Sequence, residues 1–534
     1  MTWIVIGPDK DNRYKLVSKR GTAYLLPKGS YLTVMDKENE DKPLYVLQVE
    51  QSHQEYPYTP SPLTVDMDLG KVKADLKWQN IISARVIKDL NERTDGGVNV
   101  VDILSEARRS NQQEINIAMN NEESGENKTG PAVFLATVHG NKTQILPDNN
   151  NNLLYTCLPS DLFFYQTLIC GKTGSGKTVA TKYLAQHFVD NGGAVLAINV
   201  KDVDFLKMDM PSNALSEDIE KEWEVIGEKA RSIKNFKVYY PATTKISPTK
   251  GVTPSILQPI SLDVHTIEPE ALNGILQSIS DIAGQYLPDI FRYWREARRE
   301  ENEISEITFN NFVNWFTDIN QRDEEKNKFP MRFARGDFGI APLAPGTASN
   351  ILRNLNLARA YFDDSQAYKL NGKDILQHGM MSVIDLEDEK SKTFGSVLLR
   401  HLLHQIVLLK SLNQSDVPIL IIIDEVHQFY NTESSKEALG DLDTICRQGR
   451  SQEIGVIFSS QNPTDIPKGL SNVINTKIFF KSDYGVAKSH GINISDNEIQ
   501  NLRKGFAVAN IHEMSQLKVL KFPLAFAGVI KRRD

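Results

Sequence analysis

The octapeptide GKTGSGKT, which begins at Gly171, combines the residue types that hold a chain of phosphates. Gly171, Gly174 and Gly176 allow a loop so tight that consecutive backbone N–H groups point inward at phosphate oxygens. Lys177 is placed to neutralise the β- and γ-phosphates of a nucleoside triphosphate, and the Thr178 hydroxyl to ligate Mg²⁺. The match to GxxxxGK[ST] is complete, and the alternative is a glycine-rich turn with an incidental lysine. The other candidate nucleotide-binding residues of the loop are Lys172, Thr173 and Ser175.

Two adjacent carboxylates, Asp424 and Glu425, follow the apolar run PILIII. Such a run is typical of a central parallel strand, and open parallel sheets bind ligands at the C-terminal edge of their strands. We expect Asp424 to contact Mg²⁺ through water, and Glu425 to orient or deprotonate the attacking water. The pair favours nucleotide hydrolysis over mere binding, and the alternative is a surface turn after a buried strand. His427 follows at once and is given no catalytic role.

The polar segment SSQNP ends another apolar run, at residues 459–463. Gln461 at that edge is a candidate to hydrogen-bond the γ-phosphate and report its loss. The alternative is a polar strand end without a function.

The elements around these residues are those of an α/β domain, because apolar strands alternate with longer helical segments beyond residue 160. A strand at 165–170 precedes the glycine-rich loop, and an amphipathic helix at 177–190 follows it and stops at Asn191-Gly192-Gly193. Strand, loop and helix in this order are the context that the phosphate-binding motif requires. Further strands are expected at 194–200, 380–386, 418–423, 455–460 and 476–481, and a helix at 392–412.

The regions outside this core have other patterns. Five strand-like runs separated by Gly, Pro, Asn and Asp clusters predict a small barrel or sandwich over residues 1 to about 85. The polar stretch 111–130 predicts a linker or mobile loop. Strands thin out between 268 and 372, where helices are expected at 269–283, 290–300 and 309–319. The expected domains are a barrel with linker at 1–130, the first part of the core at 131–267, a mostly helical insertion at 268–372, and the second part with a C-terminal arm at 373–534.

Composition excludes several classes of protein. A chain of 534 residues exceeds one hydrophobic core, so two or three domains are expected. The net charge of −7 argues against a small basic protein that coats nucleic acid, but local lysines and arginines can still grip phosphates. Three cysteines without a CxxC pair argue against a disulfide scaffold and a structural zinc site. No apolar run approaches 18 residues, which predicts a cytoplasmic protein without a membrane partner.

Taken together, these features resemble the HerA family, within the HerA/FtsK group of RecA-like P-loop ATPases. The resemblance implies a bacterial HerA-type DNA translocase with a RecA-like core, a mainly parallel sheet flanked by helices, ATP and Mg²⁺ as ligands, and a small barrel before the motor. The stretches that carry it are ICGKTGSGKT (169–178), NVKDVDFL (199–206), IIIDEVHQF (421–429), CRQGRSQEIGVIFSSQNP (446–463) and NVINTKIFF (472–480).

The resemblance further implies a homohexameric ring with ATP between protomers. Arg450, with Arg447 as the second choice, then becomes the candidate arginine finger that reaches a neighbour's γ-phosphate. A guanidinium suits this role because its planar fork matches the charge that develops during phosphoryl transfer. Without the resemblance, both arginines are read as surface residues of a helix.

One stretch departs from the family pattern. Relatives carry a glycine and an acidic residue just past the second strand of the core, where this chain has Asp202-Val203. Lys201, Asp202 and Asp204 are expected near the nucleotide edge of the sheet, and a role for them in assembly or metal positioning is therefore ranked below the other site assignments.

The leading hypothesis for function is an ATP-driven motor on double-stranded DNA that works with a separate nuclease or effector, in DNA-end processing or antiviral defence. A second hypothesis makes the ring a scaffold that assembles and activates an effector enzyme under the control of ATP. A conjugation or type IV secretion ATPase is a third, and a helicase a fourth. Loops with Arg332 and Arg335, and with Lys245 and Lys250, are candidate DNA contacts or ordinary solvated charges.

Overall fold

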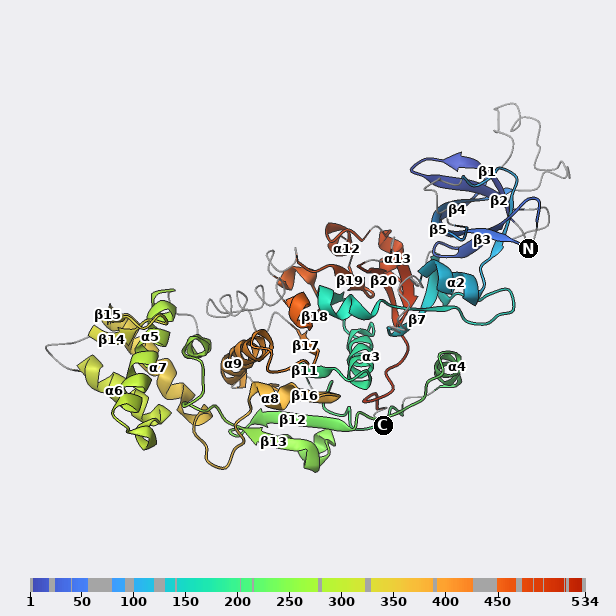
Figure 1. Cartoon of the computed structure of the whole chain (residues 1–534). Helices are drawn as coiled ribbons and strands as arrows, with labels where there is room; N and C mark the ends of the chain where they lie inside the picture. Colours follow the sequence, from blue (N-terminus) through green and yellow to red (C-terminus); the bar gives the residue numbers. More distant parts are fainter. Residues whose placement is uncertain are drawn as a thin grey trace, which may run out of the picture.

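The structure is a computed structural model that places an N-terminal barrel at one end, a helical lobe at the other and a large sheet between them (Figure 1). None of the helices in the described part of the chain is both long and apolar enough to cross a membrane. The residues described are 3–18, 25–39, 41–55, 79–91, 100–119, 130–139, 142–201, 203–213, 216–276, 281–321, 328–387, 391–425, 449–466, 473–483, 485–492, 494–512, 514 and 518–530.

The N-terminal strands close into a barrel in the order β1-β2-β5-β4-β3-β6, with antiparallel neighbours throughout. Closure leaves no free sheet edge, and the interior is filled by large apolar side chains such as Trp3 and Leu47. The strands are β1 (Trp3–Asp9), β2 (Arg13–Ser18), β3 (Tyr31–Met35), β4 (Pro43–Glu55), β5 (Gln79–Asp89) and β6 (Glu106–Arg109).

The expected linker at 111–130 begins with a helix, α2 (Gln112–Met119), so that expectation was wrong for these residues. The cause is a contact distant in sequence. Glu114 is buried, accepts a hydrogen bond from the Thr33 hydroxyl at 2.7 Å and forms an ion pair with Arg108 at 2.6 Å. These contacts fix the helix against the barrel.

The central sheet has a parallel half and an antiparallel half. The parallel half runs β13-β12-β16-β11-β17-β18-β10-β19, and β20, β21, β7 and β8 continue it with antiparallel pairing. The parallel strands are β10 (Thr167–Cys170), β11 (Ala194–Asn199), β12 (Asn235–Pro241), β13 (Leu257–Ile260), β16 (Met380–Asp385), β17 (Ile419–Asp424), β18 (Ile454–Ser460) and β19 (Thr476–Phe479). The others are β7 (Ala132–His139), β8 (Lys142–Ile145), β9 (Tyr155–Cys157), β20 (Phe506–Asn510) and β21 (Lys518–Lys521).

Helices cover both faces of the parallel half. Strand β17 shows this most clearly, because side chains alternate between faces along a strand. Ile421 and Ile423 pack into the core on the side of α9 (Ser391–Ser411), whereas Leu420 and Ile422 pack into the core on the side of α3 (Lys177–Asp190). The predicted α/β core with a mainly parallel sheet is thereby confirmed.

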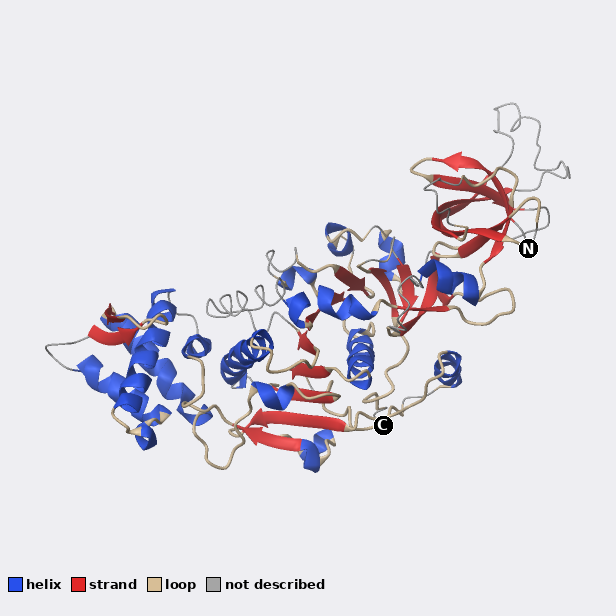
Figure 2. Cartoon of the chain, viewed as in Figure 1, coloured by secondary structure: helices blue, strands red, loops and turns tan. Residues whose placement is uncertain are grey.

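The helical lobe forms most of the insertion (Figure 2). Residues 269–283 were expected to form one helix, but residues 269–275 form a 3₁₀ turn, η6 (Pro269–Ile275), and the described part of the following α-helix starts at Asp281. The lobe also contains a hairpin that the sequence did not indicate. Its elements are α5 (Asp281–Glu300), α6 (Phe309–Gln321), β14 (Lys328–Arg332), β15 (Phe338–Pro342) and α7 (Pro345–Ala358). The remaining α-helices within the described residues are α4 (Glu217–Val225), α8 (Gly372–Ile375), α12 (Val486–Ser489) and α13 (Asp496–Gln500).

Stability is expected to depend on the central strand. Ile422 is fully buried, so Ile422→Ala removes packing on the α3 side of the sheet and should lower the free energy of unfolding by about 2–5 kcal/mol. Ile304→Ala is the matched control, because that side chain is 59% exposed and its loss should change stability by less than about 0.5 kcal/mol. Guanidinium-induced unfolding of both variants measures the difference, and equal stabilities would contradict the assignment of β17 to the core.

Candidate nucleotide site

The glycine-rich loop joins the end of β10 at Cys170 to the start of α3 at Lys177. Gly174 and Gly176 have φ angles of +78° and +113°, a region that side chains rarely adopt. A Cβ on Gly176 would also lie 2.9 Å from the backbone nitrogen of Gly505. The loop therefore requires glycine at these positions and has the curled shape that the sequence predicted.

The C-terminal part of the sheet holds this loop in place. The Lys172 N–H donates to the Lys481 carbonyl at 2.7 Å, and the Gly505 N–H donates to the Ser175 carbonyl at 2.9 Å. The Ser175 hydroxyl is buried and has no hydrogen-bond partner among the described residues. An unpartnered buried hydroxyl in a loop of inward-curled backbone fits an oxygen-rich anion such as a phosphate chain.

Lys177 lies at the start of α3 and is only 7% exposed. Its ammonium group folds back over the loop and donates to the Gly171 carbonyl at 2.5 Å. Burial lowers the pKa of Lys177, and the negative charges of Glu425 and Asp424 oppose that shift. The two carboxylates are thus close enough to the amine to act on it.

The topology of the sheet explains this approach. Strand β18 lies between β10 and β17, with Cys170 opposite Ser460 and Asp424 opposite Ser459. The three strands end at the same level. Because β10 and β17 are two strand spacings apart, the distance between them is about 10 Å. The glycine-rich loop and the acidic pair therefore share one edge of the sheet.

Asp424 is the last residue of β17 and is 4% exposed. Burial raises its pKa to about 6, with a further contribution from Glu425, while the nearby Ser459 hydroxyl and the charge of Lys177 act in the opposite direction. Thr178, the second residue of α3, is half-buried beside the loop. One carboxylate and one hydroxyl fit Mg²⁺, which usually takes few protein oxygens and fills its shell with water and phosphate oxygens.

Glu425 follows directly and is also 4% exposed. Its carboxylate forms an ion pair with Lys201 and accepts a hydrogen bond from the Gln461 side-chain amide at 3.1 Å. Burial acts to raise the pKa of Glu425, but the bonds from Lys201 and Gln461, with the charge of Lys177, outweigh it and hold the pKa below its usual range. The structure thus brings Gln461 to the acidic pair.

Arg450 lies elsewhere. It belongs to a 3₁₀ turn, η10 (Gly449–Gln452), which precedes β18, and its guanidinium carbon is 4.2 Å from the centre of the Tyr165 ring. Strand β18 has seven residues, so its N-terminal end, beside Arg450, lies roughly 20 Å from its C-terminal end, beside the nucleotide site. Arg450 is therefore not part of the nucleotide site formed by its own chain. The predictions on Arg447, His427 and Asp202 fall on positions outside the described residues.

The candidate DNA-contacting side chains are mostly paired within the chain. Arg332 forms ion pairs with Glu296 at 2.7 Å and Glu300 at 3.0 Å, and Arg335 pairs with Asp337 at 2.7 Å. Lys250 pairs with Glu387, and Lys245 is exposed. These ion pairs favour the alternative interpretation, in which the side chains are ordinary solvated charges of loops and not DNA contacts.

Two contacts of the site were not found from the sequence. The turn before Gly505 carries no motif, and its contact with the loop depends on the position of β20 in the sheet. The signal for Lys201 was present, since it is a charged residue two positions after β11 at the same edge of the sheet.

Comparisons with known proteins found similar chains among solved structures and among curated proteins. In solved structures the chain resembles the plasmid coupling protein TrwB with a non-hydrolysable GTP analogue, at 12% identity over 71% of this chain and 89% of that one, with a TM-score of 0.46. It also resembles VirB4 of Thermoanaerobacter pseudethanolicus, at 11% identity over 74% of this chain and 97% of that one, with a TM-score of 0.44.

Among curated proteins, a DNA double-strand break repair helicase HerA of Sulfurisphaera tokodaii is 25% identical over 171 residues. The match covers 29% of this chain and 34% of that relative, so the chain matches only about a third of the relative's length. Two family models match more of the chain. "Helicase HerA, central domain" matches residues 157–402, and "Helicase HerA-like C-terminal" matches residues 350–479. Together they span more than half of the sequence and include the glycine-rich loop and the acidic pair, and the chain therefore belongs to the HerA family of RecA-like P-loop ATPases.

Proposed function

We propose that this chain hydrolyses ATP with Mg²⁺ and works as a subunit of a homohexameric ring that translocates on double-stranded DNA with a separate nuclease or effector protein. One observation carries the hydrolytic part of the proposal. A buried lysine in a phosphate-type loop and two buried carboxylates lie at the same end of the parallel strands, about two strand spacings apart.

The residues divide the chemistry among them. The backbone N–H groups of the loop and Lys177 bind the phosphates, and the N-terminus of α3 adds partial positive charge. Glu425 orients a water and takes its proton as the water oxygen bonds to the γ-phosphorus, while the bond to the β–γ bridging oxygen breaks and its electrons leave with ADP. Mg²⁺, when bound through the oxygens of Thr178 and Asp424, supplies positive charge beside the phosphates.

The position of Arg450 supports the proposed ring. Phosphoryl transfer gains from a guanidinium near the γ-phosphate, yet Arg450 is about a strand length away from the site of its own chain. An exposed arginine at the opposite edge of the sheet is suited to enter the site of a neighbouring protomer. The DNA substrate is supported by membership of the HerA helicase family and by the Sulfurisphaera relative, a DNA double-strand break repair helicase, and hexameric closure is what the resemblance to this family implies.

The proposal is tested on the purified full chain. Native mass measurement with and without ATP should give a hexamer, and ATP hydrolysis should rise when duplex DNA is added. Displacement of a protein roadblock from duplex DNA then tests translocation, and strand separation on a fork tests helicase action. A chain that never consumes nucleotide in any of these conditions would contradict the proposal.

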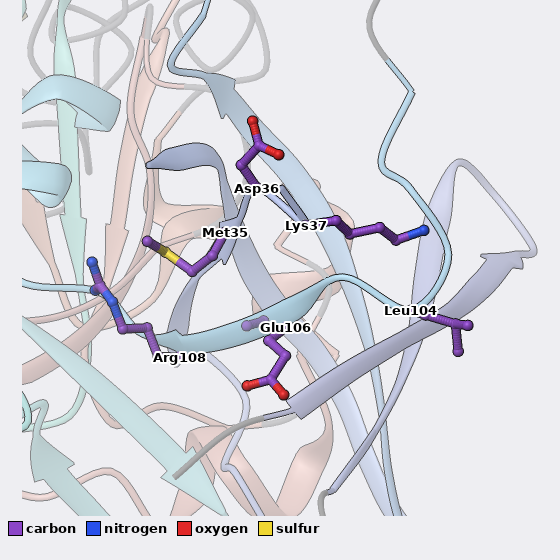
Figure 3. A pocket seen from close by; sticks show the side chains of 7 residues that line it. Met35, Asp36, Lys37, Leu104, Glu106 and Arg108 are labelled. Carbon is purple, nitrogen blue, oxygen red and sulfur yellow. The ribbon is translucent and has the colours of Figure 1, made fainter. Parts of the chain in front are cut away.

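A second candidate function, an ATP-controlled scaffold for an effector enzyme, is favoured by the barrel. It has a surface hollow of about 370 Å³ between the ends of β3 and β6, lined by charged side chains and by Leu104, which is 67% exposed (Figure 3). If the scaffold is the main role, a hydrolysis-deficient Glu425→Gln ring will still bind and activate its effector. A motor requires hydrolysis for the same effect.

Replacement of the two central groups should have different results. Lys177→Ala removes the cation that binds the phosphates, so both ATP binding and hydrolysis should be lost. Glu425→Gln keeps the shape of the side chain but not the base, so ATP should still bind while kcat falls by about 10²- to 10⁴-fold. Equilibrium binding of a fluorescent ATP analogue and steady-state phosphate release distinguish the two results. Hydrolysis by Glu425→Gln at the parental rate would show that another residue is the base.

Mixing two inactive variants tests the position of Arg450. Arg450→Ala alone should lower kcat by about 10³- to 10⁵-fold, as expected for loss of an arginine finger. Mixed rings of Arg450→Ala and Glu425→Gln contain interfaces where one protomer supplies Glu425 and its neighbour supplies Arg450. Activity should therefore return on mixing, and its continued absence in rings shown by mass measurement to be mixed would exclude a contribution between protomers.

A further inference from the structure

The side chain of Lys201 reaches the catalytic edge from a strand that carries none of the predicted site residues. Lys201 lies two residues beyond β11, which pairs with β17 in parallel register, Ile198 opposite Ile423. Its ammonium group forms an ion pair with Oε1 of Glu425. The contact joins residues 224 positions apart in the sequence, and it places a second lysine at the acidic pair in addition to Lys177.

The same oxygen of Glu425 is held from the other side. Gln461, just after β18, donates its amide N–H to Oε1 at 3.1 Å. Strands β11 and β18 flank β17 on its two sides, so the two donors approach the carboxylate from opposite neighbours. Such an arrangement fixes the direction in which the remaining oxygen of the carboxylate points.

The backbone of Glu425 gives a reason for this restraint. Its φ angle is +49°, in the left-handed region that a non-glycine residue rarely adopts. Such a conformation persists only when the surroundings hold it, and it is found at functional sites. Lys201 is suited to hold it without being buried itself, because its side chain is 39% exposed while that of Glu425 is 5% exposed.

We propose that Lys201 is a positioning residue for ATP hydrolysis, which holds the Glu425 carboxylate in the orientation from which it binds the attacking water. The inference rests on the proposed function, since it assigns Glu425 as the base. Lys201 acts through Glu425, and this role requires no contact between Lys201 and the phosphates of the nucleotide. A role in phosphate binding is the competing explanation, and it differs in its kinetic signature.

The first test is a set of substitutions in the full-length protein. Lys201→Met keeps the length of the side chain without its charge, and a misplaced base should lower kcat by about 10- to 100-fold. KM and the affinity for a fluorescent ATP analogue should stay within about twofold, because the phosphate site is intact. Lys201→Arg keeps a cation at this position and should restore most of the rate. The matched control is Lys15→Met in the barrel, where a lysine side chain of 37% exposure pairs with Glu55 at 3.4 Å, and it should leave kcat unchanged.

The second test asks whether Lys201 acts through Glu425. The double variant Lys201→Met/Glu425→Gln should be no slower than Glu425→Gln alone, because the residue to be positioned is already absent. A further loss in the double variant would show that Lys201 acts on another group. Circular dichroism of each variant checks that the fold is retained, and Lys201→Arg provides the comparison if Lys201→Met does not fold.

Several results would overturn the inference. These are an unchanged kcat in Lys201→Met, a rise in KM as large as the fall in kcat, or an Arg variant as slow as the Met variant. They differ from failure of the proposed function, which would appear as absence of nucleotide hydrolysis in the unsubstituted protein. An active parent with an equally active Lys201→Met would remove only the role of Lys201.

Discussion

The parallel pairing of β11, β17, β18 and β10 is the constraint on which the site depends. Parallel strands bring their C-terminal ends to one edge, so residues far apart in the chain meet wherever each strand ends. In this chain the four ends deliver a lysine, two carboxylates, an amide and a phosphate-type loop to the same place. The barrel and the helical lobe lie outside this arrangement (Figure 1).

Burial of this edge makes its electrostatics decisive. Asp424 and Glu425 are adjacent and almost fully buried, an arrangement in which each disfavours the charge of the other. Their environments nevertheless separate them, because the pKa of Asp424 is raised to about 6 whereas ion pairing and hydrogen bonding keep that of Glu425 low. The difference has a physical cause, because Glu425 has a cationic partner in Lys201 and an amide donor in Gln461, whereas burial dominates at Asp424.

The sequence predicted the parts of the site that are local. A glycine-rich loop between a strand and a helix, and an acidic pair after an apolar run, are each recognisable within about ten residues. The contact between Lys201 and Glu425 and that between Gly505 and Ser175 are not, because each depends on which strands become neighbours. The same dependence on contacts distant in sequence explains where the prediction of the fold was wrong. The helix at 112–119 is fixed by the barrel through Glu114, and the polar composition around it indicated a loop.

A short segment connects the N-terminal ends of the parallel strands, near Arg450, with the nucleotide site at their C-terminal ends. Tyr165, whose ring lies under the Arg450 guanidinium, is followed by Gln166, and the Gln166 side chain accepts a hydrogen bond from the Val456 N–H at 2.8 Å. Strand β10 begins at the next residue and leads directly to the glycine-rich loop. In the proposed ring, the segment 165–167 would thus support both the loop that binds a protomer's own nucleotide and the arginine that it offers to its neighbour. These three residues are buried in a close-packed interior, so they fix the distance between Arg450 and the glycine-rich loop of the same protomer.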